Sequence, residues 1–132
     1  MVDNCNINNY HNGSMLLNNR VYKDIIVTIM ISILVIINRF YQSSFYGFSY
    51  NLMNYWFNDL VGSIAFVCIV DIVSIIFINK KIEKFSCICL LMLFAGLCWE
   101  FIMPIFIKST SDWIDMCMYF LGGLIYHLLF NL

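Results

Sequence analysis

The feature that most constrains this chain is a nearly unbroken apolar run from Leu60 to Ile78, which carries one charged residue, Asp71. An α-helix needs roughly 20 apolar residues to cross the hydrocarbon core of a bilayer, and this run is close to that length. The whole chain agrees, because 62% of its 132 residues are hydrophobic and only 11% are charged. A soluble domain of this size needs a more polar surface. We therefore predict an integral membrane protein.

Similar apolar segments predict four membrane helices, over about residues 24–41, 59–79, 85–107 and 112–131. The expected fold class is thus an all-α, four-helix transmembrane bundle, with residues 24–132 as one membrane domain. Residues 1–23 are polar and rich in asparagine, which disfavours a helix, so we expect a flexible N-terminal tail. Residues 42–57 are crowded with aromatic rings and predict a loop on the bilayer surface. An alternative reading makes this loop a lid over a bound headgroup.

Basic residues predict the orientation, since cytoplasmic loops carry an excess of lysine and arginine. One side of the predicted bundle has only Arg39 and Lys108, whereas the other has Arg20, Lys23, Lys80, Lys81 and Lys84. We therefore expect both termini in the cytoplasm. The aromatic loop and the polar joint at 108–112 would then face outward from the inner (plasma) membrane.

Several classes of function receive no support from the sequence. A net charge of −1 without a large basic patch argues against nucleic-acid binding. Five of the six cysteines lie in apolar segments, where they act as small hydrophobes rather than as disulfides. No nucleophile elbow, phosphate loop or metal quartet is present, so an enzyme is the less favoured reading. We predict no catalytic residue, no metal and no cofactor.

Glu100 lies inside the third predicted helix, eight residues before Lys108 and so about 12 Å below the outer end. A charge at the bilayer centre costs roughly 2.5–3.5 kcal/mol on insertion scales, so this carboxylate needs a polar partner. Gly96 and Pro104 share its helix face, at i−4 and i+4. Because proline has no N–H, the carbonyl of Glu100 loses its helical donor as well. These observations predict a polar site at this depth.

The fourth predicted helix presents a matching stripe, with spacings of three and four residues: Asp112, Asp115, Tyr119, Gly122 and Tyr126. Tyr119 lies at a depth of about 10 Å, close to the level of Glu100, and we predict a hydrogen bond between them. The pair Gly122-Gly123 would let the third helix approach closely. Asp112 and Asp115 also fit a simpler role as N-terminal capping residues. The candidate ligand-binding residues are Glu100, Asp112, Asp115 and Tyr119.

A second polar pair is predicted nearer the cytoplasmic side. Asp71 lies about 20 Å from the outer end of its helix, and His127 about 22 Å from the outer end of the fourth. Comparable depths permit an ion pair or a hydrogen bond between them. In the alternative, His127 reaches the cytoplasmic interface alone.

A two-helix pattern covers about residues 98–127, in which a glutamate late in one helix is followed by a polar joint, an aspartate that opens the next helix, and glycines. The residues that carry it are Trp99-Glu100, Pro104, Ser111-Asp112, Asp115, Tyr119 and Gly122-Gly123. This pattern resembles the VanZ-like family of small bacterial membrane proteins. The resemblance implies a multi-pass protein of the bacterial cell envelope.

Three functions follow as hypotheses. In the first, the outward-facing acidic site of a VanZ-like protein binds a lipid-linked or glycan headgroup, or a cation. In the second, Asp71, Glu100 and His127 line the path of a small proton- or metal-coupled transporter, which would need to be a homo-oligomer because four helices are few. In the third, the polar groups serve only helix packing in an accessory or structural subunit. Membrane lipid is the expected partner in all three.

Overall fold

The computed structural model describes residues 4–41, 44, 46–102, 105 and 113–131, and these residues form helices without any strand. Helix α1 spans Asn4–Tyr41. A short helix, α2 (Phe48–Asn51), leads through the π-helical segment η2 (Leu52–Trp56) into α3 (Phe57–Ile78). The predicted all-helical fold class is confirmed for this part of the chain.

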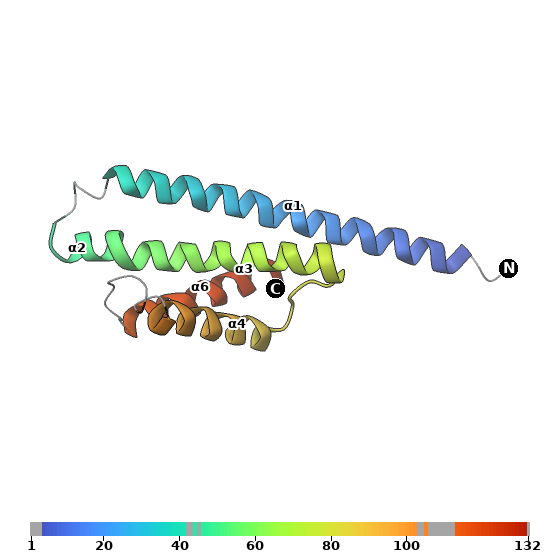
Figure 1. Ribbon diagram of the computed structural model, residues 1–132. Coiled ribbons are helices and arrows are strands. Elements are labelled where there is room, and N and C mark those ends of the chain that lie inside the picture. Colours follow the sequence, from blue (N-terminus) through green and yellow to red (C-terminus); the bar gives the residue numbers. More distant parts are fainter. Residues whose placement is uncertain (1–3, 42–43, 45, 103–104, 106–112, 132) are drawn as a thin grey trace.

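The second half of the chain forms the other two long elements. Helix α4 (Phe85–Leu97) continues into a second π-helical segment, η3 (Cys98–Ile102), and α6 spans Trp113–Asn131. Successive long helices run in opposite directions, and α1 extends past the other helices at its N-terminal end (Figure 1). The main contacts join α1 to α3, α3 to α6, and α6 to α4. Both chain termini therefore lie toward one end of the bundle, which we call the terminal end.

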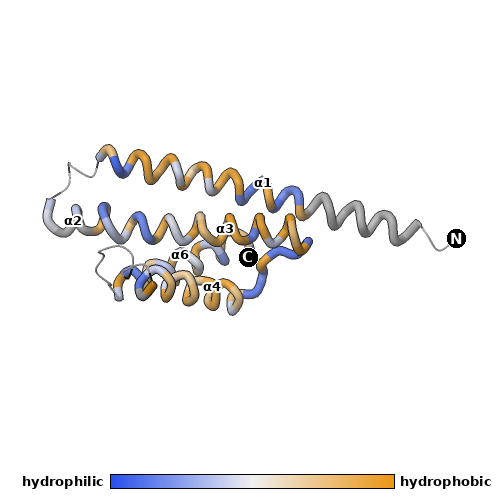
Figure 2. The backbone as a smooth tube through the Cα atoms, in the orientation of Figure 1, coloured by the Kyte–Doolittle hydropathy of each residue, from blue (hydrophilic) through white to orange (hydrophobic). Residues whose placement is uncertain are grey.

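Three helical stretches are long and apolar enough to cross a membrane, namely Leu17–Tyr41, Leu52–Ile78 and Trp113–Asn131. The stretch Phe85–Glu100 is apolar but shorter. Hydrophobic residues run along all the long helices (Figure 2), and many large apolar side chains point outward, such as Phe77, which is 81% exposed. A soluble monomer rarely exposes so large an apolar surface, whereas in a membrane the lipid tails cover it. The structure is thus that of a membrane protein, as the composition predicts.

The N-terminal segment differs from the predicted tail, because α1 begins at Asn4 and residues 4–23 continue the helix. Extending an existing helix needs no new nucleus, and this outweighs the weak preference of asparagine for other conformations. The first membrane helix therefore starts well before residue 24. One consequence is that Arg20 and Asp24 lie one turn apart on the same helix face.

The aromatic loop is shorter than the predicted 42–57, because residues from Phe48 onward are helical in α2 and η2. The side chain of Asn38 on α1 explains part of this. Its Nδ2 donates to the Met53 carbonyl at 2.5 Å and to Asn58 Oδ1 at 3.1 Å. These bonds hold the start of the second long helical stretch against the end of α1.

Helix α3 is the centre of the apolar core. Its Val67 and Cys68 are fully buried, and they belong to one cluster with Ile88 and Met92 of α4 and Tyr126 of α6. Helix α1 contributes less to the cluster, because most of its apolar side chains point away from the bundle. Close packing of α6 on both of its neighbours is therefore what holds α3 and α4 together.

Two adjacent glycines allow that packing. A Cβ added at Gly122 would meet the Leu60 carbonyl oxygen of α3 at 2.7 Å, and one added at Gly123 would meet Met92 Cγ of α4 at 2.8 Å. The close approach predicted for the 85–107 helix thus involves Gly123, while Gly122 serves α3 in the same way. Small residues at such positions let helix backbones come near each other in lipid.

We expect Gly122→Ala to destabilise the bundle by about 1–3 kcal/mol, because the added methyl group has to displace the Leu60 carbonyl. Gly62→Ala is the matched control, since nothing lies within 4 Å of a carbon added there. It should be neutral or slightly stabilising, because alanine favours a helix over glycine. Thermal unfolding in detergent, followed by circular dichroism, measures both, and equal effects would contradict the proposed packing.

Candidate functional site

Three carboxyl groups come together at the end of the bundle opposite the terminal end. Asp59 lies in the first turn of α3, Asp115 in the first turn of α6, and Glu100 in η3. The Asp59 side chain lies beside that of Asp115 and within electrostatic range of Glu100. We call these three residues the acidic cluster.

Tyr119 lies beside the acidic cluster, one turn after Asp115 on α6. Its hydroxyl is within electrostatic range of all three carboxyl groups. Gly96 makes room for its ring, because a Cβ on that glycine would lie 3.1 Å from Tyr119 Cδ2. The structure thus brings Glu100, Asp115 and Tyr119 together, while the specific hydrogen bond from Tyr119 to Glu100 stays a prediction.

The local backbone around Glu100 is unusual. Residues Cys98–Ile102 form a π-helical turn, and the Glu100 side chain within it is only 7% exposed. Such turns occur frequently at functional sites, because they change which side chains point inward. Pro104 and Asp112, which the sequence also assigns to this site, lie outside the described residues.

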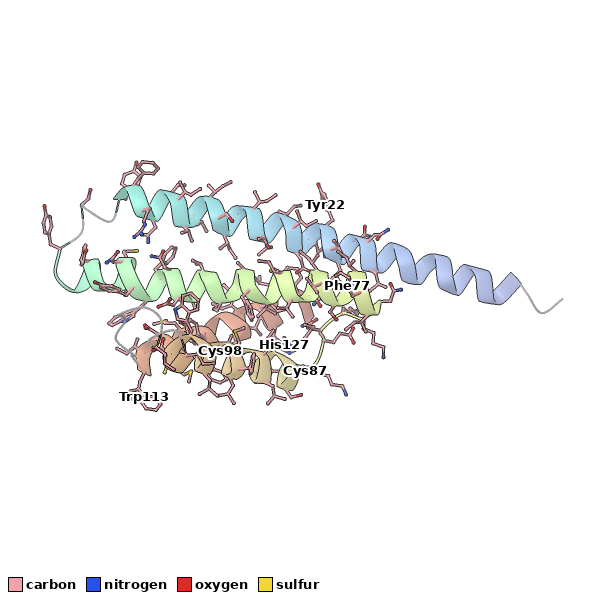
Figure 3. All side chains as sticks on the ribbon, in the orientation of Figure 1. Tyr22, Phe77, Cys87, Cys98, Trp113 and His127 are labelled. Atoms are coloured by element: carbon pink, nitrogen blue, oxygen red, sulfur yellow. The ribbon has the colours of Figure 1, made fainter. Side chains whose placement is uncertain are left out.

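A cavity of about 440 Å³ opens between α3, α4 and α6, directly beside the acidic cluster. Its wall is mostly apolar, with the carboxyl group of Asp59 and the ring of Tyr119 at its polar side. Residues from these three helices and from η3 line it: Asn58, Asp59, Gly62, Ser63, Phe66, Met92, Phe94, Ala95, Cys98, Trp99 and Tyr119. In Figure 3, Cys98 marks the position of this cavity at the start of η3, whereas Trp113 points away from the bundle.

A second polar group is buried toward the terminal end, and it consists of Arg20, Asp24, Asp71 and Tyr126. We call it the arginine cluster. Arg20 Nε donates to Asp71 Oδ2 at 2.9 Å, and the Tyr126 hydroxyl donates to the same oxygen at 2.8 Å. The backbone N–H of Ile82 donates to the other oxygen of Asp71 at 2.6 Å. This carboxylate therefore has both of its oxygens satisfied inside the protein.

A second nitrogen of Arg20, Nη1, holds the end of α6, while Nη2 donates to the Tyr126 hydroxyl at 3.1 Å. Nη1 donates to the Phe130 carbonyl at 2.8 Å and to Asn131 Oδ1 at 2.9 Å. The guanidinium carbon also lies 5.1 Å from the centre of the Phe130 ring, within the range of a cation–π contact. One arginine thus connects α1 to α3 and to α6.

The predicted pairing of Asp71 with His127 is not formed. His127 Nδ1 lies 3.3 Å from Asn131 Nδ2, and its ring packs on Phe85 at 5.1 Å between centres. Comparable depth was not sufficient, because neighbouring residues on a helix point in directions about 100° apart. Tyr126 points toward α3 and meets Asp71, whereas His127 points toward the start of α4.

Arg20, Asp24 and Asp59 were not among the candidate site residues predicted from the sequence. From the sequence, Arg20 is a basic residue in the segment before the first membrane helix, because that helix was predicted to begin at residue 24. Its spacing of four residues from Asp24 was an available signal, because such a pair shares a helix face. Asp59 sits at the start of an apolar run, where an acidic residue has the simpler reading of a helix cap.

Metal binding has limited support in this geometry. Among the described residues, no group of three or more His, Cys, Asp or Glu side chains has the arrangement of a metal site.

Comparison of the chain with family models, with curated proteins and with solved structures gives no match. The two polar clusters and the cavity are the features of the structure that bear on function.

We expect Arg20→Met to destabilise the protein by about 3–5 kcal/mol, because it leaves the buried Asp71 carboxylate without its cation. Adding Asp71→Asn should recover part of the loss, since the orphaned charge is then removed. Thermal unfolding in detergent measures both variants.

The matched control is Lys81→Met. Lys81 also forms an ion pair, with Glu83, but both of these side chains are exposed, so little change is expected. If Arg20→Met unfolds no more easily than Lys81→Met, the buried pair does not hold the bundle together.

Proposed function

We propose that this chain is a VanZ-like membrane protein of the bacterial cell envelope, which binds the headgroup of an amphiphilic molecule at the acidic cluster. The apolar part of that molecule would occupy the cavity between α3, α4 and α6. The observation that carries the proposal is that Asp59 belongs to both features. It lines the cavity and it lies beside Asp115 in the acidic cluster.

The chemistry of the site favours a particular class of headgroup. Carboxyl groups accept hydrogen bonds and attract positive charge, so they suit an amine or the hydroxyl groups of a sugar. The cavity is too apolar to hold a small hydrated cation by itself. A molecule with both a hydrocarbon chain and an amino or sugar headgroup matches both parts of the site.

Aromatic residues support a headgroup at this level. Trp99 lines the cavity while 57% of it remains exposed. Amphipathic aromatic rings favour the interface between hydrocarbon and headgroups. The mouth of the cavity would therefore lie where lipid headgroups lie, and a lipid could enter it sideways from the bilayer.

The proposed orientation places the acidic cluster outside the cell. Lys23, Lys80, Lys81 and Lys84 lie toward the terminal end, while Arg39 lies near the opposite end. Since cytoplasmic segments carry the excess of basic residues, the terminal end would be cytoplasmic. The ligand would then come from the outer leaflet of the inner membrane.

Binding can be tested with a brominated dodecylammonium probe, in nanodiscs of phosphatidylcholine. Bromine quenches tryptophan on contact, so a variant that keeps only Trp99 (with Trp56→Phe and Trp113→Phe) reports on the cavity. We expect quenching at a lower concentration of the ammonium probe than of brominated dodecyl sulfate. Asp59→Asn together with Asp115→Asn should weaken the ammonium probe about tenfold, equivalent to about 1.4 kcal/mol.

Glu83→Gln is the control for this titration, because Glu83 is an exposed acid in the loop near the terminal end. It should leave the titration unchanged. Equal quenching by the two probes, or quenching that is indifferent to both acidic-cluster substitutions, would refute a binding site for cationic headgroups.

The role in the cell can be tested by complementation of a deletion strain. We expect Glu100→Gln with Asp115→Asn to fail where the wild type restores the envelope phenotypes, because the site loses two of its charges. Membrane levels of the variant, measured by immunoblot, separate lost function from lost protein. Full complementation at normal levels would show that the acidic cluster has no part in the function.

A further inference from the structure

The arginine cluster is not part of the proposed ligand site, and its two acids have very different surroundings. Asp71 accepts hydrogen bonds from Arg20, Tyr126 and the Ile82 N–H. Asp24 is also fully buried, yet the donors that reach its carboxyl group are weak, namely the Tyr126 hydroxyl at 3.4 Å from Oδ1 and the thiol of Cys68. Its Oδ2 has no hydrogen-bond partner among the described residues. The interior thus solvates one carboxylate well and the other hardly at all.

Charge balance distinguishes two states of this cluster. Arg20 supplies one positive charge, and two ionised aspartates would supply two negative charges. The net negative charge would then be buried among apolar helices, where an uncompensated ion costs several kcal/mol. With one proton bound, the cluster is neutral. Asp24 is the better place for that proton, because the donors of the cluster converge on Asp71.

We infer that Asp24 is a proton-binding site, which holds a proton while Asp71 forms the ion pair with Arg20. A proton fits this position better than a metal cation. The guanidinium of Arg20 already occupies the side of the cluster where a cation would be attracted. Further oxygen ligands are also few, since Tyr126 and Asp71 are already engaged with each other.

The groups that face Asp24 come from three elements. On α1 they are Arg20 and Thr28, whose hydroxyl donates to the Asp24 carbonyl at 2.8 Å. Helix α3 supplies Asp71 and the thiol of Cys68, and α6 supplies Tyr126. Glu83, in the loop after α3, lies within electrostatic range of Arg20. None of these groups other than Arg20 brings a positive charge to Asp24.

A route for the proton exists beside the cluster. A cavity of about 620 Å³ opens toward the terminal end, and its wall includes Arg20, Lys23, Lys81 and Phe130. Arg20 therefore separates a water-accessible space from the buried acids. A small displacement of its side chain would expose Asp24 and Asp71 to water, so that the proton can exchange.

The release of this proton would have a structural consequence. An ionised Asp24 would compete with Asp71 for Arg20, which lies one turn away on the same helix. The bonds from Arg20 to α3 and to α6 would weaken, and α1 would be held less firmly on α3. Proton binding at Asp24 is thus coupled to the packing of α1.

Infrared spectroscopy of the full chain in phosphatidylcholine nanodiscs tests the inference at neutral pH, since a protonated carboxyl group has a C=O band that a carboxylate lacks. We expect Asp24→Asn to remove one such band from the wild-type spectrum. Glu83→Gln should remove none, because Lys81 beside Glu83 holds the pKa of that carboxyl group below its usual range. An unchanged acid region in Asp24→Asn would overturn the inference.

A second variant covers the case in which Asp24→Asn does not fold. Tyr126→Phe keeps the ring and removes the hydroxyl that reaches Asp24 Oδ1. We expect it to shift the frequency of the same band, because the hydrogen bond to the acid is lost. A band that Tyr126→Phe leaves unmoved does not belong to Asp24, and that result would also overturn the inference.

Discussion

The buried guanidinium of Arg20 is the interaction on which the packing of this bundle depends. Helix α1 has few buried apolar side chains, and its outward face is made to contact lipid. Its hold on the other helices therefore depends strongly on polar bonds from Arg20 to Asp71 and to the end of α6. Water reaches the outer side of Arg20 through the cavity at the terminal end, but Asp71 is fully buried, so loss of its bond to Arg20 leaves that carboxylate poorly solvated.

The two polar clusters lie at opposite ends of the bundle and differ in their charges. At the terminal end, Arg20 and Asp71 of the arginine cluster form a buried ion pair that joins α1 to α3. At the other end, the acidic cluster gathers charges of one sign beside an apolar cavity. Bringing like charges together in a small bundle costs free energy. The apolar core around Val67 and Met92 lies between the two and keeps them apart.

The hydrophobic pattern was sufficient to predict an all-helical fold and a membrane environment, because long apolar runs have few other stable solutions. Of the four predicted membrane helices, three are long enough to cross a membrane, and Phe85–Glu100 is shorter. The helical stripe on α6 also placed Asp115 and Tyr119 on one face, toward Glu100. Pairing across helices was predicted less well. The depth of a residue along a helix can be counted from the sequence, but the direction in which its side chain points depends on packing. For this reason Asp71 contacts Tyr126 and not His127. Residues 4–23 are helical because they extend the apolar part of α1 toward its N-terminus. The number of asparagines in this segment does not reveal that extension.

The reach of Arg20 from near the start of the chain to residues 130 and 131 has a consequence for how the protein is made. The ribosome delivers α1 to the membrane long before Asp71 exists, and longer still before Phe130 and Asn131 do. Before these partners are synthesised, the Arg20 side chain stays at the aqueous interface. Helix α1 has then not yet reached its final depth in the membrane. The final position of α1 is therefore fixed late, when the fourth helix arrives to receive it.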